Sequence, residues 1–315
     1  MNTSASESEQ RDLSLSQGQS EPPSSGPLSI LLVNYNGAQY LGPCLGSIFR
    51  YAPAGTQIIL EDNASTDRSL DIAEANIHGI EIVRSSRNLG FAAGNNLAGK
   101  RATGKFILLL NTDTELLEPI APVVDWLEKH PAYGALTINM LDAEQKPSAC
   151  TGRFPSPLRL LKLKSMLVSP ETYGGGLYDV DWVQGSFILI RADVWHSLNG
   201  LDERYFMYAE DVDLCKRIWN AGYKCAYIPG YRYLHLGGFV TSRFPDQVYG
   251  LLLYVENHMA GLQRMVCRAM LLTGCIVRAG VFKAIGFLAN RDANRAKSHA
   301  SWCAFMKLMQ RHRQE

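Results

Sequence analysis

The feature that most constrains this chain is residues 106–118, FILLLNTDTELLE, where a short apolar run passes directly into a polar, acidic one. The unbroken apolar residues Phe106 to Leu110 are typical of a strand that is buried on both faces, as in a parallel sheet. Such sheets bind ligands just beyond the carboxyl ends of their strands. Asn111 and Asp113 fall there, where a carboxylate can hold a divalent cation and, through it, a diphosphate. A polar turn closing a buried strand has the same composition, so this stretch alone leaves both interpretations open.

The same succession of buried strand and polar segment recurs through the first half of the chain. Strands are expected at residues 28–33, 57–60 and 80–84, followed by the polar segments 34–37, 61–67 and 88–96. Helices are expected at 40–51, at 67–76 with Ser65 or Thr66 as its cap, and in a segment ending near residue 102. Strands that alternate with helices through short connections predict an α/β fold, with a doubly wound, mostly parallel sheet and helices on both faces.

The second half of the chain is less regular. Helices are expected at 123–130, from 193 to 197 and from about 205 to 221, the last closed by Gly222. Strands are expected at 136–141, 183–190 and 224–228. Residues 142–180 are rich in Pro and Gly and are expected to form a long loop, which in a compact domain tends to be a lid or a binding segment.

Charge divides the chain into three parts, although its net charge is only +1. Residues 1–27 carry four acids and one base, a net −3, and their Ser/Glu/Gln/Pro-rich composition predicts a disordered leader. Residues 28–245 contain the strand–helix pattern and form the expected α/β domain. Residues 246–315 are expected to form a helical extension, and from residue 251 they hold ten Lys or Arg and three acids, a net +7. That excess indicates an anionic partner, either a membrane or a nucleic acid.

The cysteines and the N-terminus bear on the compartment. The seven cysteines are scattered and lack C-x-x-C spacing, so neither a disulfide framework nor a zinc cluster is indicated. The first residues contain no apolar segment typical of a signal peptide. We therefore expect a reduced, cytoplasmic setting.

Six segments in this order resemble the family 2 glycosyltransferases, and in particular their rhamnosyltransferase-like branch. They are VNYNG at 33–37, DNASTD at 62–67, NLGFAAGNN at 88–96, LLLNTDTEL at 108–116, QGSFILIRADV at 184–194 and LDERYFMYAEDVDLCKRIWNAGY at 201–223. Each segment alone is weak, but together they extend over about residues 28–240. The resemblance implies a GT-A fold, a nucleotide-sugar donor and transfer of the sugar with inversion.

The resemblance implies that the nucleotide sugar binds at the strand ends. Asp62 would accept a hydrogen bond from a base N–H, as the family's matching Asp does toward uracil or thymine, while an Asx turn is the structural alternative. The other residues expected at the donor are Asn34, Tyr35, Asn36, Asn88, Gly90, Asn95 and Asn111. Gly90 and Gly94 would allow a ligand to approach the backbone, although either could simply form a tight turn.

A metal site is implied at Asp113, which occupies the last position of the family's Asp-x-Asp motif. The first position here is Asn111, a departure from the strict motif. Mg²⁺ typically takes one or two carboxylates plus phosphate oxygens and water, so a single Asp suffices and Mg²⁺ or Mn²⁺ is the expected cofactor. His235 resembles a C-terminal His of many members and is a candidate further ligand, with a structural hydrogen-bonding role as the alternative.

The catalytic expectation falls on Asp211 and Glu210. In the family, the Asp of this Glu-Asp pair deprotonates the acceptor hydroxyl, which needs a carboxylate within hydrogen-bond reach of that hydroxyl. Glu210 would orient the acceptor or the base. The structural alternative is that Asp211 or Asp213 caps the helix that follows.

The C-terminal region allows two interpretations. On a helix, Arg264, Arg268, Arg278 and Lys283 form a basic face, and Met270, Val277, Val281 and Leu288 an apolar one. That arrangement is typical of an interfacial membrane helix, but the apolar face could equally pack on the catalytic domain. The uncharged run 269–277 is too short to span a bilayer, and Gly274, Gly280 and Gly286 argue against one continuous helix.

These observations predict a glycosyltransferase that moves a sugar, rhamnose being the first expectation, from a nucleotide diphosphate donor to a glycan or glycolipid acceptor in the synthesis of a bacterial surface polysaccharide. We expect it in the cytoplasm, peripheral on the inner face of the membrane if the C-terminal region binds lipid, with no nucleic-acid partner. A catalytically degenerate GT-A scaffold protein is the alternative, and the presence of Asp62, Asp113 and Asp211 argues against it. A dinucleotide-binding dehydrogenase is disfavoured because G-x-G-x-x-G is absent after the first strand.

Overall fold

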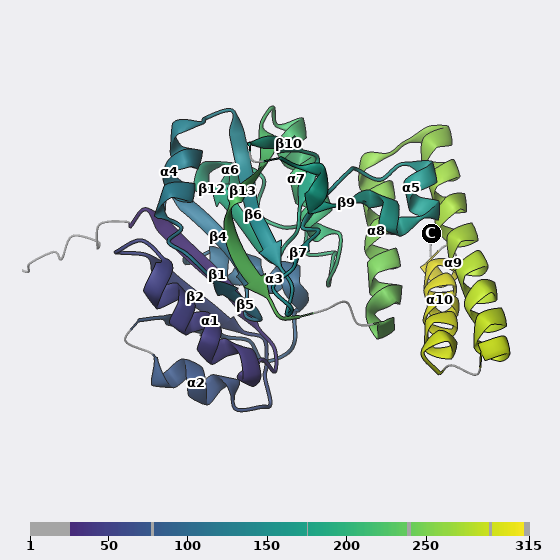
Figure 1. Cartoon of the computed structure of the whole chain (residues 1–315), viewed down its shortest axis with the longest axis horizontal. Helices are drawn as coiled ribbons and strands as arrows, with labels where there is room; N and C mark the ends of the chain where they lie inside the picture. Colours follow the sequence, from purple (N-terminus) through teal and green to yellow (C-terminus); the bar gives the residue numbers. More distant parts are fainter. Residues whose placement is uncertain (1–25, 77–78, 175, 238–240, 290–291, 312–315) are drawn as a thin grey trace, which may run out of the picture.

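A computed structural model describes residues 26–76, 79–174, 176–237, 241–289 and 292–311 (Figure 1). An α/β domain occupies one end of the molecule, and three C-terminal helices stand beside it. The disordered leader expected at residues 1–27 lies almost wholly outside the described residues, so it stays a prediction.

The centre of the domain is a ten-stranded sheet of order β10-β13-β6-β12-β4-β1-β2-β3, with β5 and β7 paired at its side. The strands are β1 Leu28–Asn34, β2 Gln57–Asp62, β3 Glu81–Arg84, β4 Phe106–Asn111, β5 Thr114–Leu116, β6 Tyr133–Leu141, β7 Pro147–Ser148, β10 Tyr178–Val180, β12 Phe187–Arg191 and β13 Lys224–His235. Strands β3, β2, β1 and β4 are mutually parallel, as are β6 and β13, whereas β12 runs antiparallel between β4 and β6. The expected mostly parallel α/β fold is therefore confirmed.

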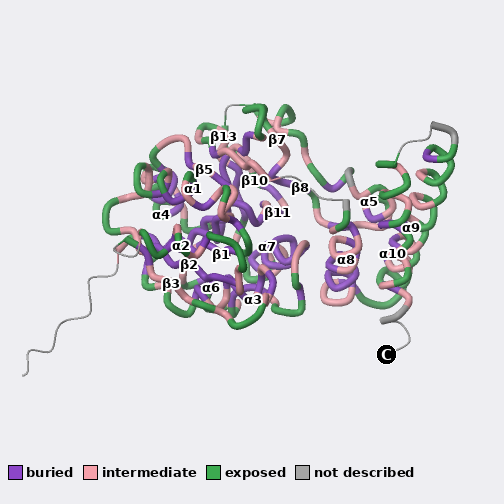
Figure 2. Tube along the Cα trace, turned by 90° about the horizontal axis from the view of Figure 1, so that it is seen from below, coloured by how far each residue is buried: buried purple, intermediate pink, exposed green. Residues whose placement is uncertain are grey.

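Helices cover both faces of the sheet (Figure 2). They are α1 Ala38–Tyr51, α2 Ser69–Ala75, α3 Gly90–Gly99, α4 Ala121–Lys129, α6 Ala192–Ser197 and α7 Glu210–Asn220. The short helix α5 Pro157–Leu161 lies instead beside the C-terminal helices (Figure 1). Successive side chains of a strand point to opposite faces. On β2, Glu61 accordingly faces Gly94 of α3 on one side, whereas Asp62 joins Asn34 and, through it, Ser69 of α2 on the other. Strand β4 between these layers has Phe106 to Leu110 buried, as its unbroken apolar run predicts.

The segment expected to be one long loop contains short elements. Strands β8 Thr151–Gly152, β9 Leu167–Val168 and β11 Trp182–Val183 form a small second sheet, and the 3-10 turns η1 Leu163–Met166 and η2 Pro170–Thr172 lie nearby. The strand expected at 183–190 is divided into β11 and β12, because the intervening Gly185 directs its N–H to a side chain of α7 instead of a neighbouring strand.

Several expected element boundaries differ from the structure. The helix expected from about residue 205 begins at Glu210, because Tyr208 and Ala209 have positive φ values that no α-helix contains. Helix α2 begins at Ser69 without a side-chain cap from Ser65 or Thr66; instead Asp67 Oδ1 accepts the Ser69 N–H at 3.0 Å. Strand β13 continues past Ile228 to His235 after an irregularity, because its second part pairs with β5. Gly222 closes α7 with a φ of +89°, as expected.

The C-terminal helices are α8 Phe244–His258, α9 Gly261–Ala289 and α10 Asp292–Arg311, preceded by the turn η3 Thr241–Arg243. Helix α9 is continuous, contrary to expectation. A Cβ on Gly274 would lie 3.4 Å from Leu161 O of α5, and one on Gly286 would lie 3.3 Å from Arg295 of α10. The glycines thus allow close helix packing, which compensates for their low helix propensity.

Helix α9 does not present the expected basic face. Arg268 Nη1 lies 3.9 Å from Glu256 Oε1, and the Arg278 guanidinium lies over the rings of Phe244 and Phe282. As one helix, α9 includes a stretch, Gly261–Phe287, that is long and apolar enough to cross a membrane by length and composition, and 17% of its most apolar window is buried. The expectation that this region is too short to span is therefore wrong by that measure.

A carboxyl group lies within the sheet, at Glu61 of β2, which has no exposed surface. Ser85 Oγ donates a hydrogen bond to Glu61 Oε1, while Oε2 has no hydrogen-bond partner among the described residues. Burial raises the pKa of Glu61 to about 7. Between about pH 4.5 and about pH 7, Glu61 is therefore protonated in the folded protein but ionised in the unfolded chain. The free energy of unfolding accordingly falls as the pH rises through this range.

We predict that Glu61→Gln, which cannot ionise, stabilises the protein by up to about 3 kcal/mol at pH 8 and has little effect at pH 4.5. Urea unfolding at both pH values would measure the difference. Glu144→Gln, at an exposed turn, is the matched control and should change neither value. An equal effect of Glu61→Gln at both pH values would contradict a raised pKa.

Candidate active site

The carboxyl ends of the parallel strands bring the sequence-predicted residues to one edge of the sheet. Asn34 pairs in register with Asp62, and Val33 with Asn111, so three strand ends lie side by side. The loop after β4 and the end of β13 meet there, since Leu236 N–H donates to Asp113 O at 2.9 Å. The start of α7 approaches the same edge through Gly185, which directly precedes Ser186, the acceptor of the Asn111 N–H.

Asn34 is a buried hub that orients Asp62. Its Nδ2 donates to Asp62 Oδ1 at 3.1 Å, Ser65 Oγ at 3.0 Å and Ser69 Oγ at 2.8 Å. Asp62 Oδ2 also accepts the Ser65 N–H at 3.3 Å. Because Asn34 has no exposed surface, its contribution is to hold the Asp62 carboxylate in place.

The next residues on the β1 loop lie at the surface. Tyr35, which directly follows Asn34, is 48% exposed. Asn36 has a positive φ of 53°, and its Oδ1 accepts the Thr66 N–H at 2.8 Å. The loops after β1 and β2 are thereby tied together, with Tyr35 left available for stacking.

The segment from 88 to 96 is largely occupied by contacts within the protein. Asn88 Oδ1 accepts the Gly90 N–H at 2.9 Å, and Asn95 Nδ2 donates to Phe91 O at 2.9 Å. Gly90 has a φ of +85°, and a Cβ there would lie 2.3 Å from Phe206 O. A Cβ on Gly94 would lie 2.8 Å from Glu61 Oε2. Both glycines are thus explained by close packing against protein atoms.

Asp113 and His235 lie together, with His235 Nε2 3.3 Å from Asp113 Oδ1. The pairing of His235 with Thr114 across β13 and β5 brings the imidazole to this position. Two ligands at adjacent positions of an octahedral ion, each about 2.1 Å from the metal, are separated by about 3 Å, so this pair fits a Mg²⁺ or Mn²⁺ site. Within the described ranges no group of three or more His, Cys, Asp or Glu residues could hold a metal ion, so Asp113 and His235 are a pair without a third such side chain.

Two acids begin α7, Glu210 and Asp211, and both are buried. Asp211 Oδ2 accepts the Gly185 N–H at 2.9 Å, and its Oδ1 accepts the N–H of Val212 at 2.8 Å. Glu210 Oε2 has no hydrogen-bond partner among the described residues. Burial raises the pKa of both groups; the neighbouring Asp211 raises that of Glu210 further, and backbone N–H groups partly offset the rise at Asp211. An oriented carboxylate with a raised pKa is suited to accept a proton.

Sequence reasoning missed the role of Asp213, which it considered only as a possible cap. Asp213 is 1% exposed, and its carboxylate bonds Arg217 Nε at 2.7 Å and His258 Nε2 at 2.7 Å. Burial opposes its ionisation, but these bonds outweigh burial and lower the pKa of Asp213. The spacing of Asp213 and Arg217 by four residues was a usable signal. The contact of Asp213 with His258 had no such signal in the sequence, because His258 lies in another helix.

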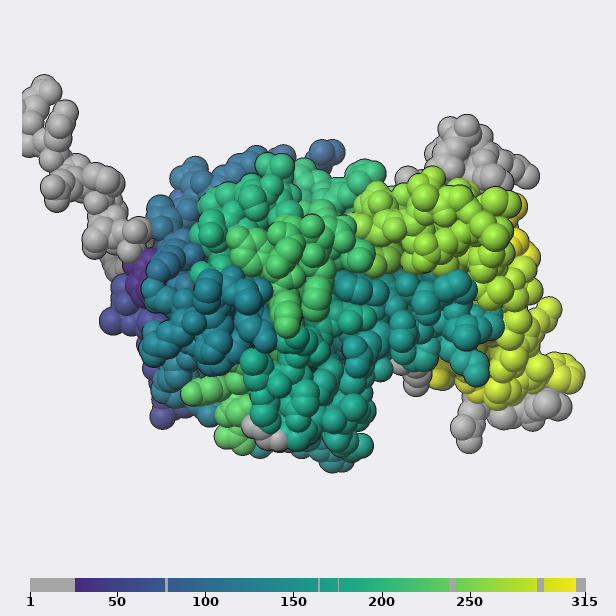
Figure 3. Space-filling model, turned by 90° about the horizontal axis from the view of Figure 1, so that it is seen from above, coloured from purple at the N-terminus to yellow at the C-terminus, as the bar shows by residue number. Residues whose placement is uncertain are grey.

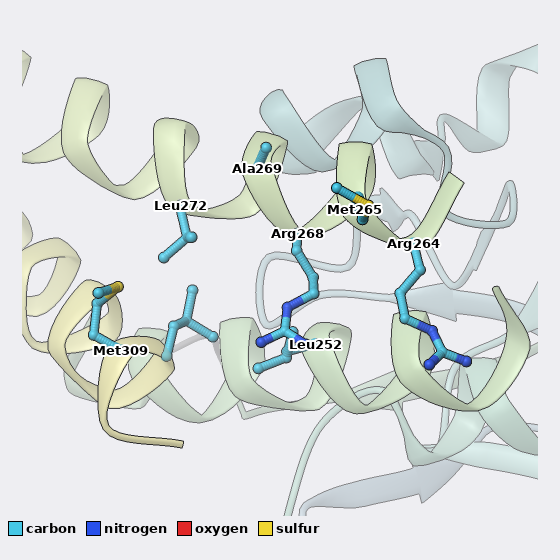
Figure 4. Close-up of a pocket in the computed structure, with 8 residues that line it drawn as sticks. Leu252, Arg264, Met265, Arg268, Ala269, Leu272 and Met309 are labelled. Atoms are coloured by element: carbon cyan, nitrogen blue, oxygen red, sulfur yellow. The ribbon is translucent and has the colours of Figure 1, made fainter. Parts of the chain in front are cut away.

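A groove of about 370 Å³ lies away from the sheet edge, between α8, α9 and α10 (Figure 4). Its lining comprises Leu252, Arg264, Met265, Arg268, Ala269, Leu272, Leu308 and Met309. None of these belongs to the site described above. In the space-filling view the C-terminal helices lie directly against the α/β domain (Figure 3).

The sequence model described as Glycosyl transferase family 2 matches residues 29–147, which include the ends of β1, β2 and β4. Among curated proteins, the chain is 27% identical over 241 residues to the N-acetylglucosaminyl-diphospho-decaprenol L-rhamnosyltransferase of Mycobacterium tuberculosis, covering 69% of this chain and 78% of that one. It is 28% identical to the rhamnosyltransferase WbbL of Escherichia coli, covering 57% of this chain and 72% of that one.

Solved structures agree on the fold. The mannosyltransferase PcManGT of Pyrobaculum calidifontis, in complex with GDP-Man and Mn²⁺, superposes with a TM-score of 0.57 at 16% identity, over 92% of this chain and 88% of that one. TarS of S. aureus superposes with a TM-score of 0.53 at 18% identity, over 82% and 74%. The chain therefore has a GT-A fold, its residues 29–147 match the family 2 glycosyltransferases, and the curated proteins that it resembles include rhamnosyltransferases.

Proposed function

We propose that the chain is an inverting, metal-dependent glycosyltransferase that moves L-rhamnose from a thymidine diphosphate donor to a lipid-linked glycan during bacterial polysaccharide synthesis. The observation that carries the proposal is the Asp211 carboxylate, which is buried, held by two backbone N–H groups and located at the sheet edge that also presents Asp62 and Asp113. The named acceptor of the mycobacterial relative, a diphosphodecaprenol-linked sugar, suggests the acceptor class.

The nucleotide would bind over the ends of β1 and β2. Asp62, fixed by Asn34 and the Ser65 N–H, would accept a hydrogen bond from the N–H of a thymine or uracil base. The exposed ring of Tyr35 would stack on that base. Asn36, Asn88, Gly90 and Asn95 would shape this half of the site through the loop contacts that they make, and Asn111 would border the diphosphate.

Asp113 and His235 would hold Mg²⁺ or Mn²⁺, whose charge would neutralise the negative charge that develops on the leaving diphosphate. Asp211 would remove the proton from an acceptor hydroxyl as that oxygen forms its bond to the anomeric carbon. Attack from the face opposite the diphosphate inverts the anomeric configuration. Glu210, with its raised pKa, would remain protonated beside Asp211 and orient the acceptor or the base.

We predict that Asp211→Asn lowers sugar transfer at least 100-fold, because an amide cannot accept the proton, and leaves the melting temperature unchanged or higher, because a buried charge is removed. Release of nucleoside diphosphate from a panel of nucleotide sugars, with a polyprenyl-diphosphate-linked acceptor, would measure transfer and identify the donor. We expect dTDP-L-rhamnose to be used best.

Asp193→Asn is the matched control for that substitution. Asp193 also stands in the first turn of a helix, and its Oδ1 likewise bonds the N–H of the following residue, Val194, at 2.8 Å. It is exposed and should keep full activity. Asp213→Asn is unsuitable as a control because Asp213 is buried and paired. Near wild-type turnover by Asp211→Asn would remove the base assignment.

The metal assignment predicts that Asp113→Ala lowers transfer at least 100-fold, and that His235→Ala lowers it about tenfold, since a carboxylate is the stronger ligand of Mg²⁺ and Mn²⁺. Calorimetric titration of Mn²⁺ in the presence of thymidine diphosphate should show weaker binding in both variants. His196→Ala, at an exposed position of α6, is the control. Full turnover in excess EDTA would contradict the assignment.

We further propose that α9 lies in the interface of an anionic membrane. Its exposed large apolar side chains are Leu262, Met265, Ile276, Val277, Val281, Ile285 and Phe287. At 100° per residue, Leu262, Met265, Ile276 and Phe287 fall within roughly 60° of one another. Helix α9 has four basic residues and no acid; Arg268 and Arg278 contact groups within the protein, which leaves Arg264 and Lys283 to meet anionic head groups. If α9 spanned a membrane, the charges of Arg268 and Arg278 would lie within its hydrocarbon core, which is costly. An interfacial position is therefore favoured.

The membrane assignment predicts that the protein binds vesicles containing anionic lipid at low salt and is released by added salt. The double variant Leu262→Glu/Phe287→Glu should bind at least tenfold more weakly, because two apolar anchors are replaced by acids. Phe49→Glu, an equally apolar exposed site on α1, should bind as wild type does. Co-sedimentation would measure binding, and unchanged binding of the double variant would contradict the proposal.

A further inference from the structure

The first turn of α7, which carries Glu210 and Asp211, is contacted at two places by α8, the first of the C-terminal helices. Helix α8 lies outside the matched family segment, residues 29–147.

The first contact supports an unfavourable backbone conformation. Tyr208 and Ala209, directly before Glu210, have φ values of +72° and +69°, which L residues rarely adopt. Gly250 of α8 packs against them: a Cβ at Gly250 would lie 2.2 Å from Tyr208 O and 3.2 Å from Ala209 Cβ. Two successive left-handed residues persist only where the surroundings hold them.

The second contact is the buried Asp213 carboxylate, two residues after Asp211. His258 Nε2 lies 2.7 Å from Asp213 Oδ1, and Asn257 Nδ2 donates to the same oxygen at 3.3 Å. The His258 ring is itself held against Tyr254, with ring centroids 4.6 Å apart. The last turn of α8 thus fixes the rotation of the first turn of α7.

We propose that His258 and Gly250 are positioning residues for the catalytic carboxylates. Gly250 admits the left-handed Tyr208–Ala209 segment, His258 anchors Asp213, and between these two points Asp211 is directed toward the acceptor hydroxyl. The inference rests on the proposed transfer reaction. Under this proposal α8 holds the catalytic carboxylates in position, whether or not α9 also binds a membrane.

The geometry indicates positioning more than simple stability. Asp211 reaches Gly185 N–H from the same turn that Asp213 anchors, so a rotation of that turn displaces the base directly. A displacement of about 1 Å can cost roughly 100-fold in rate. Neither His258 nor Gly250 contacts the Asn34–Asp62 cluster, so the affinity for the nucleotide should not depend on them.

Steady-state kinetics on the full-length protein test the proposal with two substitutions. His258→Ala and Gly250→Ala should each lower kcat about 10- to 100-fold while the donor KM and the Kd for thymidine diphosphate stay within twofold of wild type. His258→Gln, whose amide can still donate to Asp213, should recover most of kcat. Hydrogen–deuterium exchange should show faster exchange at residues 205–213 in the two Ala variants.

The controls are Leu252→Ala, which removes a buried side chain of α8 that faces the groove, and Gly280→Ala, where an added Cβ meets open space. Leu252→Ala should lower the melting temperature and keep kcat. If wild type transfers sugar and His258→Ala keeps its kcat, or if His258→Gln fails as His258→Ala does, the positioning role is refuted. If wild type transfers no sugar, the proposed function fails, and unchanged exchange at 205–213 in the Ala variants would refute the anchoring separately.

Discussion

The interaction on which the active site depends is the buried contact of Asp213 with Arg217 and His258. The first turn of α7 contains three acids, and burying Glu210 and Asp211 without a cation is unfavourable, as their raised pKa values show. Asp213, two residues after Asp211, has the opposite environment, because its bonds to Arg217 and His258 outweigh burial and lower its pKa. A stable, charged anchor therefore holds a turn whose two functional acids would otherwise favour exposure to water.

The nucleotide half of the site shows the same division between adjacent carboxyl groups. Asp62 is satisfied by Asn34 and the Ser65 N–H, whereas Glu61, one residue earlier, has an unsatisfied oxygen and a pKa raised to about 7. Because alternate residues of a strand face opposite sides, one acid meets a polar cluster and the other meets α3. The alternation of side chains along β2 thus decides which acid lies in the polar cluster and which has a raised pKa. Because Glu61 faces α3 and not the Asp62 cluster, Glu61 can be substituted to stabilise the protein without changing a contact of that cluster.

Patterns with short range in the sequence predicted the fold well. The apolar run of β4, the strand–helix alternation and the polar strand ends are local features, and the structure confirms the sheet that they predict. What the sequence did not contain was long-range packing. In helix α9, which is continuous, α5 packs on Gly274 and α10 packs on Gly286. Arg268 and Arg278 do not form the expected basic face, because Arg268 contacts Glu256 and Arg278 lies over two aromatic rings. The contact of Asp213 with His258 joins residues 45 positions apart and could not be read from spacing.

Helix α8 contacts α7 on one side and α10 on the other, so a change to α10 can also reach the catalytic turn of α7. On one side it holds α7 through Gly250 and His258, and on the other it is tied to α10, where Lys307 Nζ lies 2.7 Å from Asp246 Oδ1. Removal of α9 and α10 would expose α8 and could disturb the catalytic turn at the same time, so loss of activity in such a truncated chain would not show that the protein needs lipid. Substitutions at Leu262 and Phe287 of α9, which are highly exposed and do not line the groove beside α8, separate a membrane contact from the support of the base.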